Sequence, residues 1–103
     1  MASKGFSGSL TINNSYFYGN KNLAVGTGQV GGEGGAIYIY APTSSAVISI
    51  NNSYFDSNEA VKNVASGKKK LADGGAIAVF NIVEGAKFTI NNSTFANNIA
   101  GDD

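Results

Sequence analysis

The chain has 103 residues, the size of one small domain, and its seven lysines balance seven acidic residues, so that the formal net charge at pH 7 is zero. It contains no Cys, His, Arg or Trp, which excludes disulfide frameworks, Cys/His metal sites and His-dependent catalytic triads. There is no basic footprint, no visible signal peptide after Met1 and no apolar run of about 18 residues. We therefore expect neither nucleic acid as a partner nor insertion into a membrane.

The composition favours strands over helices. Gly, Asn, Ala and Ser make up about half of the chain, and charged residues account for 14%. Hydrophobic residues reach 43% and aromatic residues 11%, which is enough to build a packed core. Gly and Asn are weak helix formers, whereas Ile, Val, Thr, Tyr and Phe favour strands, so the composition predicts an all-β protein.

Two motifs recur along the chain. Ile-Asn-Asn-Ser followed by Phe-x-x-Asn occupies residues 12–20, 50–58 and 90–98, and Gly-Gly-Ala-Ile occupies residues 34–37 and 74–77. The offsets are 38 and 40 residues. A fixed period of this length is typical of solenoids.

The predicted strands are short and alternate apolar with polar residues. The first type covers residues 10–12, 48–50 and 88–90, and a second begins at Ile37 and Ile77. Each segment is too short to be stable alone, but equivalent segments can pair at about 4.8 Å. The repeat therefore predicts a parallel β-helix of about two and a half coils, with about three strands and one variable loop in each coil.

We treat residues 1–103 as a single domain with repeat units at about 10–47, 48–87 and 88–103. The segments at about 21–33 and 59–73 differ in length and are expected to be surface loops.

The first coil is expected to lack its first strand. Ile37 and Ile50 are 13 residues apart, and the same step counted back from Ile12 falls before Met1.

The repeat also predicts columns of equivalent side chains along the axis. We expect inward apolar columns, a stack of phenylalanines, and an asparagine ladder whose amides bond from coil to coil at a tight turn that needs the left-handed conformation. These columns contain Leu10, Ile48 and Phe88; Ile12, Ile50 and Ile90; Phe17, Phe55 and Phe95; and Asn20, Asn58 and Asn98. The Gly-Gly pairs suit a sharp entry into the next strand.

Gly-Gly-Ala-Ile together with Phe-x-x-Asn resembles the repeat of polymorphic outer-membrane proteins and of adhesin-like surface proteins of bacteria and archaea. The resemblance extends over about residues 10–100. It implies a β-helical protein with an extracellular or cell-surface location and an adhesive or structural role.

Two sets of residues are candidates for contacts outside the fold. Each Asn-Asn-Ser matches a glycosylation acceptor, or alternatively is only a copied turn. Tyr38, Tyr40 and Phe80 alternate with inward residues and are candidates for an exposed aromatic surface, unless the variable loops cover them. The glycosylation candidates are Asn13, Asn51 and Asn91.

The acidic residues suggest weaker alternatives. Asp56 with Glu59, and Glu33 with Asp73, are the carboxylate pairs that a polysaccharide-active enzyme would need. Glu33 and Asp73 also precede the Gly-Gly pairs, where they would hold a cation or cap the turn. With no Arg or His in support, we predict no catalytic, metal or cofactor-binding residue and no cofactor.

Two further segments have ordinary interpretations. The glycine pattern at residues 26–31 lacks the helix that a dinucleotide fingerprint requires, which favours a loop. The lysine run at residues 68–70 is expected to be solvated, although such a run can also contact anionic groups.

Neither end of the array has a visible polar cap. Open coil ends present unpaired backbone groups, and a contact between unlike ends that does not close produces a filament. The sequence therefore predicts a non-enzymatic extracellular structural protein that assembles head to tail with identical subunits. The alternative is part of a cell-surface adhesin that binds carbohydrate or a host surface protein.

Overall fold

The computed structural model describes residues 1–25, 33–63 and 73–101. Within these residues the secondary structure consists of twelve short strands and no helix. In chain order the strands are β1 (Ala2–Lys4), β2 (Ser9–Asn13), β3 (Tyr16–Tyr18), β4 (Lys21–Val25), β5 (Ile37–Tyr40), β6 (Val47–Asn51), β7 (Tyr54–Asp56), β8 (Glu59–Asn63), β9 (Ile77–Phe80), β10 (Lys87–Asn91), β11 (Thr94–Ala96) and β12 (Ile99–Gly101).

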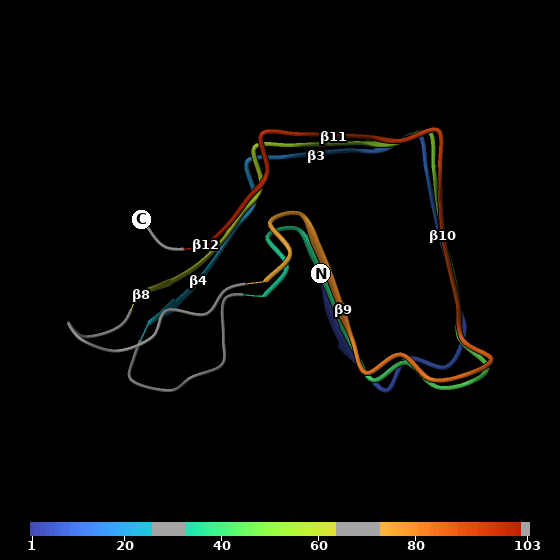
Figure 1. Cartoon of the computed structure of the whole chain (residues 1–103). Helices are drawn as coiled ribbons and strands as arrows, with labels where there is room; N and C mark the ends of the chain where they lie inside the picture. The colour runs from blue at the N-terminus through green and yellow to red at the C-terminus, as the bar shows by residue number, and fades with distance from the viewer. Residues whose placement is uncertain (26–32, 64–72, 102–103) are drawn as a thin grey trace.

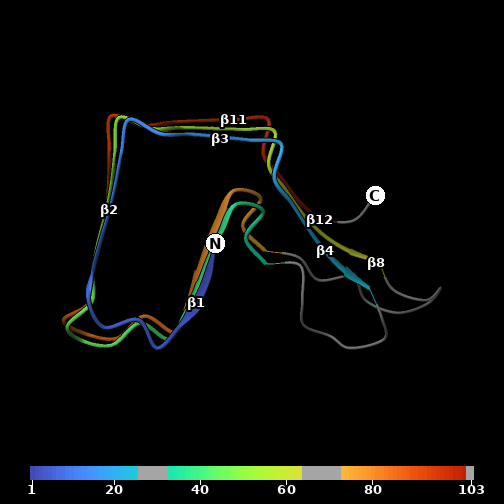
Figure 2. The same ribbon diagram turned by 180° about the vertical axis from the view of Figure 1, so that it is seen from behind.

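The strands form four parallel sheets of three strands each. We call them sheet A (β1, β5, β9), sheet B (β2, β6, β10), sheet C (β3, β7, β11) and sheet D (β4, β8, β12). Each circuit of the chain adds one strand to every sheet, giving rung 1 (β1–β4), rung 2 (β5–β8) and rung 3 (β9–β12). Figures 1 and 2 show the three rungs stacked along nearly the same path. The prediction of an all-β parallel β-helix is confirmed.

Each rung has four strands rather than about three. The additional strands β4 and β8 begin at Lys21 and Glu59, where the sequence pattern indicated variable loops. These strands lack a clear alternation of apolar residues, but their backbones pair in register, and Lys21 Nζ lies 3.2 Å from a Glu59 carboxylate oxygen.

The expectation that the first coil lacks its first strand is wrong. β1 pairs with β5, with Ala2 opposite Tyr38 and Lys4 opposite Tyr40. The link between β1 and β2 covers residues 5–8, whereas the link between β5 and β6 covers residues 41–46. Because the first link is two residues shorter, a count that assumes a fixed link passes beyond the start of β1.

The core lies between sheets A, B and C, which form three sides of a box in Figures 1 and 2, while the strands of sheet D diverge from it. Rung 2 supplies most of the buried side chains because it has a rung on either side. Its fully buried hydrophobic residues include Ile37, Ile39, Ile48, Ile50 and Phe55, and also Ala46, Ala60 and Val61. The equivalent side chains of rungs 1 and 3 pack against this cluster on one side only and are more exposed.

One residue per rung adopts a left-handed conformation at each of the two corners that flank sheet C. Between sheets B and C, φ is 47–50°, and between sheets C and D it is 56–66°. Gly and Asn adopt this region more readily than other residues. The residues are Asn14, Asn52 and Asn92 at the first corner, and Gly19, Ser57 and Asn97 at the second.

These positions refine the predicted turns. The left-handed residue at the second corner is the one before each asparagine of the predicted ladder, not that asparagine itself. The Gly-Gly pairs do form sharp entries into sheet A, since Gly34 has φ 66° and Gly74 has φ 64°.

Candidate functional site

The asparagines at the corner between sheets C and D form an inner column that bonds from rung to rung. Asn20 Nδ2 donates to Asn58 Oδ1, and Asn58 Nδ2 donates to Asn98 Oδ1, both at 2.9 Å. The backbone N–H groups of Asn20 and Asn58 donate to the same oxygens at 3.1 and 3.0 Å. Asn58 is fully buried, and its Nδ2 also donates to the Phe17 carbonyl. This column therefore satisfies the buried polar groups of the corner.

The phenylalanines of sheet C stack directly on one another. The Phe17 and Phe55 rings are 4.6 Å apart with an angle of 1° between their planes. Phe55 and Phe95 are 4.8 Å apart at 2°. Phe55 is completely buried, whereas Phe95 is 43% exposed at the free face of rung 3.

The predicted glycosylation candidates form an outer column of their own. Asn51 Nδ2 donates to Asn13 Oδ1, and Asn91 Nδ2 donates to Asn51 Oδ1, both at 3.0 Å. Neighbouring side chains are one rung apart, so the column leaves little room for adjacent glycans. The sequence showed the column as a repeated position, but not that its amides bond to each other.

The serines of Ile-Asn-Asn-Ser form a further column that the sequence interpretation missed. Ser53 Oγ accepts from the Ser15 N–H at 3.2 Å, and Ser93 Oγ accepts from the Ser53 N–H at 3.1 Å. Each hydroxyl in turn donates to the carbonyl two residues earlier. The signal was again the exact recurrence of a polar residue beside a corner.

The predicted aromatic surface on sheet A is half-buried. Tyr38 contacts both Tyr40, at 6.5 Å between ring centroids, and Phe80, at 5.9 Å. Lys4 Nζ lies 5.9 Å from the centre of the Tyr40 ring. Partial burial raises the pKa of the Tyr38 phenol, and the Glu33 carboxylate raises it further.

A more exposed aromatic cluster lies on the outer face of sheet C. Tyr16, Tyr18 and Tyr54 are 62%, 64% and 38% exposed. The Tyr16 ring lies 5.9 Å from Tyr18 and 5.3 Å from Tyr54. These tyrosines flank the phenylalanines in sequence, so their alternation with Phe17 and Phe55 was the signal that could have revealed them.

Asp56 lies beside this tyrosine cluster. Its carboxylate accepts from the Ser57 hydroxyl at 2.8 Å and from Asn97 Nδ2 and the Tyr16 hydroxyl at 3.3 Å. These hydrogen bonds, led by that of Ser57, lower the pKa of Asp56. Glu59 pairs instead with Lys21. The two carboxylates of the suggested enzymatic pair are thus each engaged in separate interactions.

Glu33 and Asp73 both lie next to a Gly-Gly pair, as the sequence places them. The Gly34 N–H donates to the backbone carbonyl of Asp73 at 2.8 Å. Within the described ranges, no three acidic residues come together as a group that could hold a metal ion.

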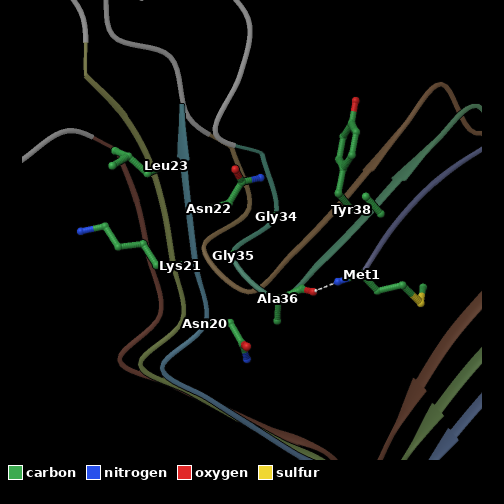
Figure 3. A pocket seen from close by; sticks show the side chains of 10 residues that line it. Met1, Asn20, Lys21, Asn22, Leu23, Gly34, Gly35, Ala36 and Tyr38 are labelled. Carbon is green, nitrogen blue, oxygen red and sulfur yellow. Dashed lines mark hydrogen bonds between the residues drawn. The ribbon is translucent and has the colours of Figure 1, made fainter. Parts of the chain in front are cut away.

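A cavity of about 530 Å³ opens at the rung 1 end between sheets A and D. Figure 3 shows β4 on one side and the segment at residues 34–36 on the other, with Met1 and Tyr38 beyond it. The Lys21 and Leu23 side chains point away from the segment, whereas Asn22 points towards Gly34. The Met1 ammonium group donates to the Ala36 carbonyl at 2.7 Å.

Two motifs considered in the sequence, at residues 26–31 and 68–70, lie outside the described residues. In the part of the chain that the structure covers, no helix is sufficiently long and apolar to span a membrane.

Part of rungs 1 and 2 is similar in sequence to a known repeat. Residues 14–40 match the family model of the Chlamydia polymorphic membrane protein repeat. This stretch contains Phe17-x-x-Asn20 and the Gly-Gly-Ala-Ile motif at residues 34–37, so the match confirms the resemblance to the polymorphic membrane protein repeat on both motifs. Neither the curated proteins nor the solved structures gave a match.

Proposed function

We propose that this chain is a non-enzymatic, extracellular structural protein of the cell surface that assembles head to tail through the ends of its β-helix. The match to a membrane protein repeat supports an adhesin-like surface role. The observation that carries the assembly proposal is the opposite polarity of the two asparagine columns.

In the inner column each amide donates towards rung 3, and in the outer column each donates towards rung 1. The rung 1 end therefore presents Asn20 Oδ1 as an acceptor and Asn13 Nδ2 as a donor. The rung 3 end presents the complementary groups, a remaining Asn98 Nδ2 hydrogen and Asn91 Oδ1. Rung 1 of one copy stacked on rung 3 of another brings a donor to an acceptor in both columns.

The apolar and charged residues of the end rungs match in the same register. Phe95 would stack on Phe17 of the next copy, as Phe55 does within the chain. The lysines of the end strands would face uncharged residues. The facing pairs would be Lys4 with Phe80, Lys21 with Ile99, and Lys87 with Ser9. Each joint would also continue four parallel ladders of backbone hydrogen bonds.

Negative-stain electron microscopy and light scattering over a range of protein concentrations test this assembly. We expect uniform fibres for the wild-type chain. Phe95→Glu buries a charge in the joint and should abolish them. Val47→Glu is the matched control, because Val47 is 40% exposed on the side of rung 2, away from both ends.

Circular dichroism checks that both variants remain folded. A wild-type chain that stays monomeric at every concentration would overturn the assembly proposal, as would fibres formed equally by Phe95→Glu.

The second candidate is an adhesin module that binds carbohydrate or a host surface protein. The tyrosine cluster of Tyr16, Tyr18 and Tyr54 favours it, because tyrosine combines an apolar ring with a polar tip and is enriched at interfaces. Asp56 adds an anionic acceptor beside these rings. A glycan screen and a pull-down with host surface proteins would test it, with Tyr18→Ala reducing binding and Ser49→Ala on sheet B leaving it unchanged.

A further inference from the structure

Three tyrosines and one aspartate occupy the corners of a square on the outer face of sheet C. Tyr16 and Tyr18 of β3 lie opposite Tyr54 and Asp56 of β7. The residue between the two members on each strand is a phenylalanine of the inward stack, so the four side chains lie on the outer face. We call these four residues the tyrosine–aspartate patch.

The aromatic rings of the patch are accessible to a ligand. Tyr16 and Tyr18 are 62% and 64% exposed, and Tyr54 is 38% exposed. Rung 3 continues this face with the small residues Thr94 and Ala96, so no large side chain of that rung covers the patch. The face of an aromatic ring carries partial negative charge and attracts a cation within about 6 Å of its centre. The exposed rings therefore favour a cationic ligand.

Asp56 adds a carboxylate with room for one more hydrogen bond. In the described part of the chain, its Oδ1 accepts from the Ser57 hydroxyl and Asn97 Nδ2, and its Oδ2 accepts from the Tyr16 hydroxyl. Each carboxylate oxygen accepts about two hydrogen bonds, so Oδ2 retains one position. The hydrogen bonds from Ser57, Asn97 and Tyr16 lower the pKa of Asp56, which is therefore ionised at neutral pH. A lysine ammonium needs only one such position, whereas the arginine fork uses both oxygens.

The lysines whose side chains the structure describes form no ion pair with this carboxylate. Lys21 pairs with Glu59 on sheet D, and Lys4 Nζ lies 5.9 Å from the centre of the Tyr40 ring on sheet A. The contact of Lys4 is an example, within this chain, of a lysine placed near an aromatic ring face. In the tyrosine–aspartate patch the rings and the carboxylate are present, and the described lysines leave them open to a cation of a partner.

We propose that the tyrosine–aspartate patch binds a lysine side chain of a partner protein, with the ammonium group on Asp56 Oδ2 and the aliphatic stem against the tyrosine rings. A lysine complements both the carboxylate and the ring faces, whereas a neutral sugar leaves the negative charge uncompensated. The proposal rests on the adhesin module above, the second candidate function, and names the chemistry of its partner. It does not depend on assembly, because the patch lies on the side of the β-helix.

The test measures how strongly the full chain is retained on dense layers of immobilised peptide by surface plasmon resonance. One layer presents Gly-Ser-Lys-Ser-Gly, and the matched layer has norleucine in place of lysine, which keeps the aliphatic stem and removes the charge. A dense layer is used because closely spaced lysines raise the effective concentration at a weak site. We expect an apparent affinity about tenfold higher on the lysine layer, since both the carboxylate and the rings contact the ammonium group.

Two substitutions assign the binding to the patch. Asp56→Asn and Tyr18→Leu should each reduce the apparent affinity for the lysine layer by about threefold. Glu84→Gln is the control for the change in net charge, because the link between β9 and β10 that contains it lies opposite sheet C (Figure 1). Tyr40→Leu on sheet A is the control for the loss of a tyrosine ring. Neither control should change retention, and circular dichroism checks that all four variants are folded.

Equal retention on the lysine and norleucine layers would overturn the lysine site, as would an unchanged affinity after Asp56→Asn. Binding to a neutral glycan that Tyr18→Ala weakens, without retention on the lysine layer, would overturn the lysine site and leave the adhesin module in place. A chain that binds neither lysine peptide, glycan nor host surface protein would overturn both.

Discussion

At the scale of single residues, we expect the Asn58 amide to stabilise the corner between sheets C and D more than the amides of Asn20 and Asn98 do. It is fully buried and bonds to Asn20, Asn98 and the Phe17 carbonyl. Asn58→Ala should lower the free energy of unfolding by about 3 kcal/mol, because buried partners lose their hydrogen bonds. Urea denaturation measures this change.

Asn20→Ala is the matched control, because it removes the same atoms from the exposed end of the inner column. We expect a loss of about 1 kcal/mol, since water can replace the missing bond. Similar losses for the two variants would show that burial does not decide the contribution of these amides.

Ala41 offers a stabilising substitution. It has a φ of 50°, whereas the equivalent residues are Gly5 and Asn81, both of which tolerate the left-handed region. Ala41→Gly should raise the free energy of unfolding by about 1 kcal/mol, because the Cβ atom is unfavourable in this conformation. Ala46→Gly, in the same link, should instead be destabilising, because Ala46 is buried and has no positive φ. A thermal melt that ranks the two variants in the opposite order would contradict the argument.

Asp56 should contribute to the pH dependence of stability. Its pKa in the folded chain lies below the ordinary value of 3.8, chiefly because of the Ser57 hydroxyl. A depressed pKa means that the stabilisation is present above about pH 4 and is lost as the pH falls through the folded-state pKa. Asp56→Asn should therefore lose less stability than the wild type on acidification. The urea midpoints of the wild type and of Asp56→Asn are measured at successive pH values. Parallel curves of midpoint against pH would refute this prediction.

At the scale of elements, the Gly-Gly pair before sheet A allows the backbone to lie close to sheet D, because glycine has no Cβ atom. Gly35 lies against Glu59, the first residue of β8. Gly35→Ala should cost about 3 kcal/mol, since its Cβ atom meets backbone atoms that cannot move aside. Gly8→Ala is the control, because the nearest atom to its Cβ is 3.9 Å away on the Phe6 ring. Chemical denaturation that gave equal losses for both would show that the entry tolerates a side chain.

The sequence could predict those elements that repeat both in residue type and in spacing. Sheets B and C follow from residues 12–20, 50–58 and 90–98, where apolar alternation and corner asparagines recur together. The sequence pattern did not reveal β1, because Ala2, Ser3 and Lys4 share no residue type with β5 and the link after them is shorter. The sequence pattern did not reveal β4 and β8 either, because these strands pair through their backbones without a repeated hydrophobic pattern.

The candidate surface features were predictable only in part, for a related reason. Repetition identified the columns at Asn20 and Phe17, but side chains at non-repeated positions carry no such signal. Tyr16 and Tyr54 occupy equivalent positions, but Tyr18 corresponds to Asp56 and Ala96, so the exposed tyrosine cluster follows the repeat only in part. The cavity depends on how sheets A and D diverge, which no local pattern encodes.

At the scale of the whole molecule, rung 2 is paired with a neighbouring rung on both of its faces, whereas rungs 1 and 3 are each paired on one face. Strands of rung 2 bond to neighbours on either side, whereas an end strand in a parallel sheet leaves about half of its N–H groups unpaired. Amide exchange in the monomeric Phe95→Glu chain should therefore be slowest in β5–β8 and faster in β1–β4 and β9–β12. In wild-type assemblies the end rungs should slow to the rate of rung 2, because each gains a neighbour at the joint. End rungs that stay fast in the assembled sample would place the contact between copies on the sides of the β-helix rather than on its ends.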